Sequence, residues 1–226
     1  MQIDFFKEGK GVSPSEPEKS RFVKFFLIYG MRFWKLISLN LLYLVFCIPI
    51  ITIGPATVAM ANVLRRYSEE KLTYVWSDFF ETFRSCFRSA LLYSVIYVIP
   101  MAVAGYAVYF YFLQAQQTAW AYVLFGAMLL VSICLFISSL YAVILIGSVT
   151  LTLRQTVKNS LILSIVAVKQ NLLALFCWLL GAICILLLFP ASLLLVLLLL
   201  PVTMWYTAVY ILNPVIKKYC IWQEDQ

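Results

Sequence analysis

Histidine is absent from this sequence, and charged residues are scarce. Only 12% of the 226 residues are charged, whereas 64% are hydrophobic. Soluble domains contain about half apolar and about a quarter charged residues, so the composition argues against a soluble protein. A net charge of +7 would suggest nucleic acid as the partner of a soluble protein. Here the basic residues flank apolar runs, and we predict no nucleic-acid binding.

Metal-ligand patterns are also missing. The six cysteines form no C-x-x-C pair, and without histidine they give no ligand set for a metal. We therefore predict no metal site and no cofactor, and we interpret the cysteines as small apolar packing groups with reduced thiols.

Acidic residues are absent from the long apolar runs. All ten lie outside them: Asp4, Glu8, Glu16, Glu18, Glu69, Glu70, Asp78, Glu81, Glu224 and Asp225. Ion and proton relays in membranes usually depend on buried acids or histidines, so an ion-coupled transporter is disfavoured. The sequence also lacks the phosphate-binding, G-x-S-x-G and H-E-x-x-H motifs. We predict that the protein is not an enzyme and has no catalytic residues.

Three uncharged runs dominate the sequence, at 36–64, 89–153 and 170–216. A membrane-spanning helix needs about 20 apolar residues, so the second and third runs are each long enough for two spans. The polar break at 113–118 and Pro190 divide them into spans of about 89–112, 119–147, 171–189 and 191–212. The predicted fold is an all-α polytopic transmembrane helical bundle, with a broken first hairpin, four further spans and amphipathic cytoplasmic lead-in helices.

The first run contains a predicted structural hinge, formed by Pro49, Gly54, Pro55 and Thr57. Proline breaks the hydrogen bonding of a helix and disfavours helical geometry in the residue before it. A helix from about Phe33 is therefore expected to kink at Pro49 and to stop at Ile53 or Gly54, and Pro55 suits the start of a returning helix. The alternative is one kinked span with a loose exit.

Positive charges favour the returning hairpin. Of the 17 Lys and Arg residues, 7 precede Leu36, 5 lie in 65–88, 3 in 154–169 and 2 at 217–218. If the first run goes in and comes back, all 17 lie on one side of the membrane, as the cytoplasmic retention of basic residues requires. This arrangement puts both termini in the cytoplasm and, if the run spans the membrane twice, the tip at Gly54 and Pro55 outside. The sequence leaves open whether the run spans twice or is re-entrant.

The segment at 73–90 is predicted to be an amphipathic helix that leads into a span. Asp78 and Glu81 resemble an N-cap with a capping box. One interpretation is a plain interfacial helix. The other is a docking surface for a cytoplasmic partner, formed by Asp78, Glu81, Arg84 and Arg88.

We divide the single membrane domain, residues 1–226, by these features. Its parts are a cytoplasmic head and linker (1–20), the broken hairpin (33–66), a lead-in helix with two spans (73–147), a second such unit (154–212) and a cytoplasmic tail (213–226). The head either rests in the headgroup layer or is disordered. The two lead-in units hint at an internal repeat.

Four polar residues within the first run are expected to be buried: Asn40, Thr52, Thr57 and Asn62. They are interpreted as hydrogen-bonding groups between helices or back to the chain, with contact to a substrate as the alternative.

Several stretches together resemble the YesL family of bacterial membrane proteins, a family of unknown function. They are Phe5-Phe6-Lys7-Glu8-Gly9-Lys10-Gly11, Asn40-Leu41-Leu42-Tyr43, Ile48-Pro49-Ile50, Thr52-Ile53-Gly54-Pro55-Ala56-Thr57, Ser77-Asp78-Phe79-Phe80 and Lys158-Asn159-Ser160-Leu161. The resemblance runs almost the full chain, and its most specific part is Gly-Pro-Ala-Thr. Ser85-Cys86-Phe87-Arg88 departs from the more amide-rich, basic pattern that the family suggests at the lead-in.

The resemblance implies a non-enzymatic accessory protein in the plasma membrane of a bacterium. Its implied partners are the lipid bilayer and subunits of an ABC-type importer for oligosaccharides. The alternative function is an independent small-solute transporter or channel, with the broken hairpin lining its path.

Overall fold

The computed structural model describes residues 20–116, 118–149, 151–189 and 192–221, and within these ranges it is helical without a β-strand. The first half contains α1 (Arg21–Met31), α2 (Phe33–Cys47), η1 (Ile50–Thr52), α3 (Ile53–Ser68), α4 (Val75–Ser85) and α5 (Phe87–Ala115). The second half contains α6 (Ala121–Ser148), α7 (Leu153–Val166), α8 (Val168–Leu187), α9 (Ser192–Leu198), α10 (Leu200–Ile216) and the π-helical turn η2 (Lys217–Ile221). The predicted all-α class is confirmed, while the predicted head at 1–20 lies almost entirely outside the described residues.

Helix α3 forms the centre of the molecule. Every residue from Gly54 to Leu64 is buried, because α2, α4, α5, α6 and α10 all pack around this one helix. Small side chains such as Ala56, Ala59 and Ala61 allow these neighbours to approach closely. The returning half of the broken hairpin is therefore the core of the protein and has little exposure to lipid.

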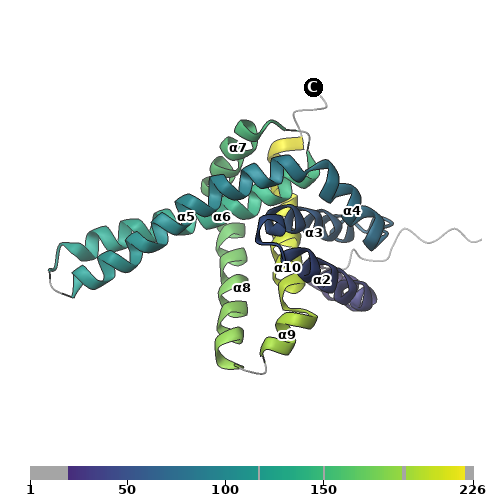
Figure 1. Ribbon diagram of the computed structural model, residues 1–226, viewed down its shortest axis with the longest axis horizontal. Helices are drawn as coiled ribbons and strands as arrows, with labels where there is room; N and C mark the ends of the chain where they lie inside the picture. Colours follow the sequence, from purple (N-terminus) through teal and green to yellow (C-terminus); the bar gives the residue numbers. More distant parts are fainter. Residues whose placement is uncertain (1–19, 117, 150, 190–191, 222–226) are drawn as a thin grey trace, which may run out of the picture.

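Two long arms extend from this centre (Figure 1). Helices α5 and α6 run side by side as one arm, and α8 pairs with α9 and α10 in the other. Helices α5, α6 and α8 are long and apolar enough to cross a membrane, as expected for the spans at 89–112, 119–147 and 171–189. The fourth predicted span, 191–212, is divided between α9 and α10. Helices α1 and α2, bent by 72° at their junction, are together long and apolar enough for one more crossing.

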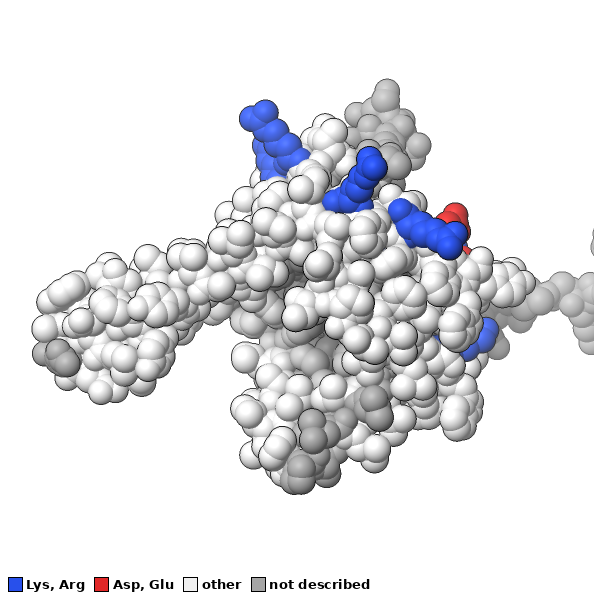
Figure 2. Space-filling model, viewed as in Figure 1, with Lys and Arg blue, Asp and Glu red and all other residues white. Residues whose placement is uncertain are grey.

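Charged side chains gather on one part of the visible surface. Figure 2 shows Lys and Arg over the upper and right-hand parts of the molecule, whereas the described atoms at the ends of both arms are uncharged. The sequence agrees, because the connections at 113–120 and 188–195 contain no charged residue. This separation is the pattern of a membrane protein whose arms point away from its basic side.

The hinge differs in detail from the sequence prediction. Helix α2 ends at Cys47, so the prediction that it continues through Pro49 to Ile53 or Gly54 is wrong. Pro49 is extended and is followed by the short turn η1, and α3 begins at Ile53 with Pro55 in its first turn. The hydroxyl of Thr52 donates to the carbonyl of Pro49 at 2.7 Å and also to that of Phe46. These bonds satisfy acceptors left free by the early end of α2.

The tip of the hairpin lies close to the basic residue at the start of α5. Gly54 packs directly against Ala90 and Ser94 of α5, and Arg88 precedes Ala90 by only two residues. The Cα atoms of Gly54 and Arg88 therefore lie within about 15 Å in any orientation, about half of a ~30 Å hydrocarbon core. This proximity favours a re-entrant hairpin over one whose tip lies outside, and the position of the tip relative to the membrane stays a prediction.

The tip of the hairpin is apolar and open to its surroundings. Ile48, Ile50 and Ile51 are 78%, 82% and 71% exposed. Because Phe46, just before the tip, packs against Phe79, Phe80 and Phe83 of α4, the whole hairpin stays close to the basic side. A re-entrant hairpin and a full double crossing both keep all positive charge on one side, so the charge distribution favours the two arrangements equally.

Candidate functional site

A network of charged side chains surrounds Glu69, directly after α3. Its carboxylate pairs with Arg65 at 3.1 Å, Lys71 at 2.7 Å and Lys217 at 3.1 Å, and it accepts a hydrogen bond from the amide of Asn213 at 3.1 Å. The side chain of Glu69 is only 5% exposed. We call these five residues the Glu69 hub. It joins the end of α3 to the end of α10, which lies 144 residues further along the chain.

The hub keeps Glu69 ionised. Burial by itself raises the pKa of this carboxyl group, but the hydrogen bonds from Lys71 and Asn213, the charge of Arg65 and the hydrogen bond from Lys217 together lower the pKa to about 2. A buried carboxylate is stable only when such partners compensate for its lost hydration.

A second set of contacts fixes α4 against α3. Arg66 pairs with Asp78 at 2.8 Å, and the other Asp78 oxygen accepts the backbone N–H of Tyr74 at 2.9 Å. Asn62 donates to the hydroxyl of Thr82 at 2.7 Å within the buried interface. Asp78 is thus a structural anchor between α3 and α4.

These contacts correct two predictions about Asp78. Helix α4 begins at Val75 with Tyr74 as its N-cap, so Asp78 is not an N-cap residue but lies in the first turn and binds back to the N-cap N–H. It is also buried, so it is not part of an open docking surface. Glu81, Arg84 and Arg88 are exposed, and a partner surface formed by these three residues stays a prediction.

Arg32, at the bend between α1 and α2, contacts the loop between α3 and α4. Its guanidinium donates to the hydroxyl of Thr73 at 3.0 Å and to the carbonyl of Lys71 at 3.2 Å, and it lies 4.4 Å from the ring centroid of Tyr67. Since α1 also packs along α10, through Phe25 with Tyr206 and Tyr210, the N-terminal helices are fixed to the same basic side as the hub.

A cavity of about 390 Å³ lies beside the hinge. Its walls include Gly54 and Thr57 of α3, Tyr97 of α5, Trp178 of α8 and Trp205 of α10. Among the described residues it has an aromatic and aliphatic lining with few polar atoms. The indole N–H of Trp178 is buried without a hydrogen-bond partner, so this N–H is not accessible from the cavity, and the wall offers mainly aromatic and aliphatic faces to a small solute.

The hydroxyl groups around this cavity are already occupied. Thr57 donates to the carbonyl of Ile53 at 2.6 Å, and Ser94 donates to that of Ala90 at 2.9 Å. Asn40, also predicted to be a buried polar group, binds across helices to Val196 and Val202 at the break between α9 and α10. These bonds confirm the interpretation that Asn40 and Thr57 hydrogen-bond to backbone groups, between helices or within their own helix.

One further polar cluster lies between helices and was missed in the sequence. The hydroxyl of Tyr97 lies 2.7 Å from those of Ser138 and Ser160, which brings α5, α6 and α7 together. In the part of the chain that the structure describes, no group of three His, Cys, Asp or Glu side chains is arranged to hold a metal ion.

Residues 36–111 match the model of a protein family described as "Protein of unknown function, DUF624". The chain is similar to that family over about a third of its length. The matched stretch contains the hinge, all of α3, Glu69 and α4, together with most of α5. No curated protein and no solved structure matches the chain.

The sequence predicts only part of the Glu69 hub. The spacing of Arg65 and Glu69, four residues apart on one helix face, is a signal for an ion pair. No such signal exists for Asn213 and Lys217, because they meet Glu69 only through the tertiary packing of α10 on α3.

Proposed function

We propose that this protein is a non-enzymatic accessory subunit of an ABC-type importer for oligosaccharides in a bacterial plasma membrane, with both termini in the cytoplasm. The observation that carries the proposal is the resemblance to the YesL family. Four of its motifs, at 40–43, 48–50, 52–57 and 77–80, lie within the stretch that matches the family of unknown function. The structure makes this stretch the central part of the fold.

The exposed charges of α4 support a partner on the cytoplasmic side. Glu81, Arg84 and Arg88 follow the helix spacing of three and four residues and point away from the packed face of α4 and the start of α5. The ion pairs of the hub and of Asp78 do not involve them. Such a strip of one acidic and two basic residues supports a contact with a polar, charged subunit surface.

Purification in a mild detergent tests the proposal. We expect a tagged protein, isolated from its native membrane, to retain the subunits of a sugar importer. Charge reversal of Arg84 and Arg88 to Glu is expected to lower the retained amount at least fivefold. The matched control is Arg154→Glu on α7, where the arginine is exposed and belongs to another helix. A wild-type protein that retains no importer subunit contradicts the proposal.

The alternative is a small-solute transporter or channel, and the cavity beside the hinge favours it. The broken backbone of α2 and α3 lines this cavity through Gly54 and Thr57, as in transporters whose discontinuous helices form the binding site. The purified protein alone, reconstituted into liposomes, separates the two functions. Solute uptake without any other subunit supports the transporter, and impermeable liposomes support the accessory role.

A further inference from the structure

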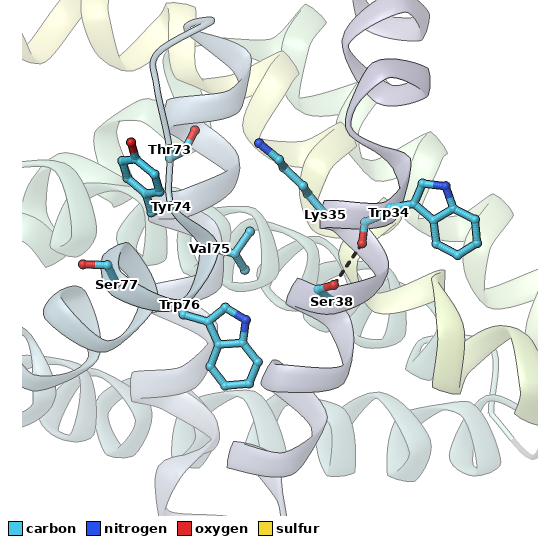
Figure 3. A pocket seen from close by; sticks show the side chains of 8 residues that line it. All are labelled: Trp34, Lys35, Ser38, Thr73, Tyr74, Val75, Trp76 and Ser77. Carbon is cyan, nitrogen blue, oxygen red and sulfur yellow. Dashed lines mark hydrogen bonds between the residues drawn. The ribbon is translucent and has the colours of Figure 1, made fainter.

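The strongest unassigned feature is a groove between the start of α2 and the start of α4 (Figure 3). It has a volume of about 620 Å³ and is lined by Trp34, Lys35, Ser38, Thr73, Tyr74, Val75, Trp76 and Ser77. This volume is within the ~300–1,000 Å³ range of small-molecule sites. We propose that the groove binds the phosphate headgroup of an anionic phospholipid, a site that does not depend on the proposed function.

The charge inside the groove is positive and uncompensated. Lys35 is exposed and lies in the wall with its side chain directed toward the Thr73 side of the groove. It has no ion-pair partner among the described residues, and no acidic residue lines the groove. The nearby carboxylates of Glu69 and Asp78 are already bound to other cations. An anion is the ligand that complements this charge.

Arg32 adds a second positive charge behind the groove. It donates to Thr73, which itself lines the groove, and neither of its hydrogen bonds goes to a carboxylate. The two cations are separated by three residues at the start of α2, so they approach an anion from the same helix end.

The rim of the groove has the composition of a membrane interface. Trp34 is 78% exposed and Trp76 is 61% exposed, and they stand on opposite sides of the groove (Figure 3). Tryptophan is enriched at the level of lipid headgroups, where an apolar ring meets a polar layer. The groove also lies where α1 and α2 bend by 72°, close to the basic side of the molecule.

An apolar track continues from the groove for the acyl chains. Trp34, Ser38, Leu41 and Val45 follow at intervals of four and three residues and therefore share one face of α2, and Ile48 continues this spacing directly after the helix. Leu41, Val45 and Ile48 are 42%, 58% and 78% exposed. From Lys35 to Ile48 the helix rises about 20 Å, which is enough to follow an acyl chain through one leaflet of a ~30 Å core. The combination of a basic groove and an apolar track fits a lipid better than a soluble phosphate.

The test uses the full chain, purified and delipidated in a neutral detergent. Binding of phosphatidylglycerol, phosphatidylcholine and free sn-glycerol 3-phosphate is measured by native mass spectrometry and by the shift in melting temperature. We expect phosphatidylglycerol to bind and stabilise the wild type, and Lys35→Gln to weaken its binding about fivefold. That factor corresponds to about 1 kcal/mol for one basic residue at an anionic surface. Lys35→Arg is expected to keep the binding.

The matched control is Lys158→Gln, on the exposed face of α7 and away from the groove. It is expected to bind phosphatidylglycerol as the wild type does. Equal binding by Lys35→Gln and the wild type, or equal weakening by both glutamine variants, overturns the site. Equal binding of phosphatidylcholine overturns the requirement for an anion. Stabilisation by glycerol 3-phosphate at the same concentration overturns the lipid as the source of the phosphate.

Discussion

Gly54 offers the sharpest test of the fold, because a single methyl group has no room there. A Cβ atom on Gly54 would lie far inside van der Waals contact with the hydroxyl oxygen of Ser94 and 2.9 Å from the carbonyl oxygen of Ala90. The Ser94 side chain can rotate, but the Ala90 carbonyl belongs to the backbone of α5. Gly54→Ala therefore forces α3 and α5 apart, and Gly54→Leu is expected to do so more strongly.

The expected loss follows from these contacts. Overpacking of a well-packed core costs about 1–3 kcal/mol. Replacement of glycine by alanine within a helix gains at most about 1 kcal/mol in the opposite direction. We expect Gly54→Ala to destabilise the protein by about 1–2 kcal/mol, which lowers the melting temperature by ~2–8 °C for a chain of this size.

Melting in detergent, followed by fluorescence-detected size exclusion, measures this loss. Gly105→Ala and Gly126→Ala are the matched controls, since nothing lies within 4 Å of a Cβ at either position. They are expected to keep or raise the melting temperature. Ser94→Gly in the Gly54→Ala background removes the side-chain clash and is expected to restore part of the loss. A Gly54→Ala protein that melts at or above the wild-type temperature refutes the close packing of α3 on α5.

Three further predictions concern the Glu69 hub, the side of the membrane on which the hairpin tip lies, and the buried amide of Asn40. Glu69→Gln is expected to cost about 3 kcal/mol, because Arg65 loses its partner in a buried pair. Since the pKa of Glu69 in the folded chain is about 2, below its ordinary value of 4.5, its contribution to stability is fully present above pH 4.5 and is lost as the pH falls toward 2. The wild type should therefore lose more melting temperature between pH 5 and pH 3 than Glu69→Gln does. In a cysteine-free background, new cysteines at Ser68, Gln155 and Ile51 should resist a membrane-impermeant thiol reagent from outside, and one at Gln116 should react. Labelling of Ile51→Cys from outside contradicts the re-entrant hairpin. Asn40→Leu is expected to lower stability by about 1–3 kcal/mol, because the carbonyl of Val196 and the backbone N–H of Val202 lose their hydrogen-bond partner. An unchanged melting temperature would contradict a stabilising role for the Asn40 amide.

The existence of the hinge was predictable, but its depth was not. Pro49 and Pro55 mark a break by their own chemistry, whatever surrounds them. The end of α2 at Cys47 depends instead on the Thr52 hydroxyl, which reaches back to Phe46 and Pro49. The depth of the tip depends on the contact of Gly54 with Ala90 and Ser94. Charge counting cannot distinguish a full crossing from a re-entrant hairpin, because both leave every basic residue on one side.

In the candidate site, too, local helix spacing predicts some features, whereas contacts between distant segments decide the others. Glu81, Arg84 and Arg88 are exposed, as their position opposite the apolar face of α4 predicts. Asp78 shares their spacing but turns inward, because Arg66 of α3 and the backbone N–H of Tyr74 each bind one of its carboxylate oxygens. The groove beside Lys35 was not predictable, because the starts of α2 and α4, about 40 residues apart in the sequence, meet there only through the folding of the hairpin.

The Glu69 hub can be completed only late in synthesis, because its partners from α10 and η2 are made long after Glu69. Asn213 is made 144 residues after Glu69, and at about 5–20 residues per second the ribosome needs roughly 7–30 s for that distance. Until then Glu69 has only its local partners Arg65 and Lys71, and the face of α3 that α10 later covers has no neighbour. The helix that organises the fold is thus among the first to be synthesised and among the last to be enclosed. A newly made chain therefore depends on α10 to bury its core.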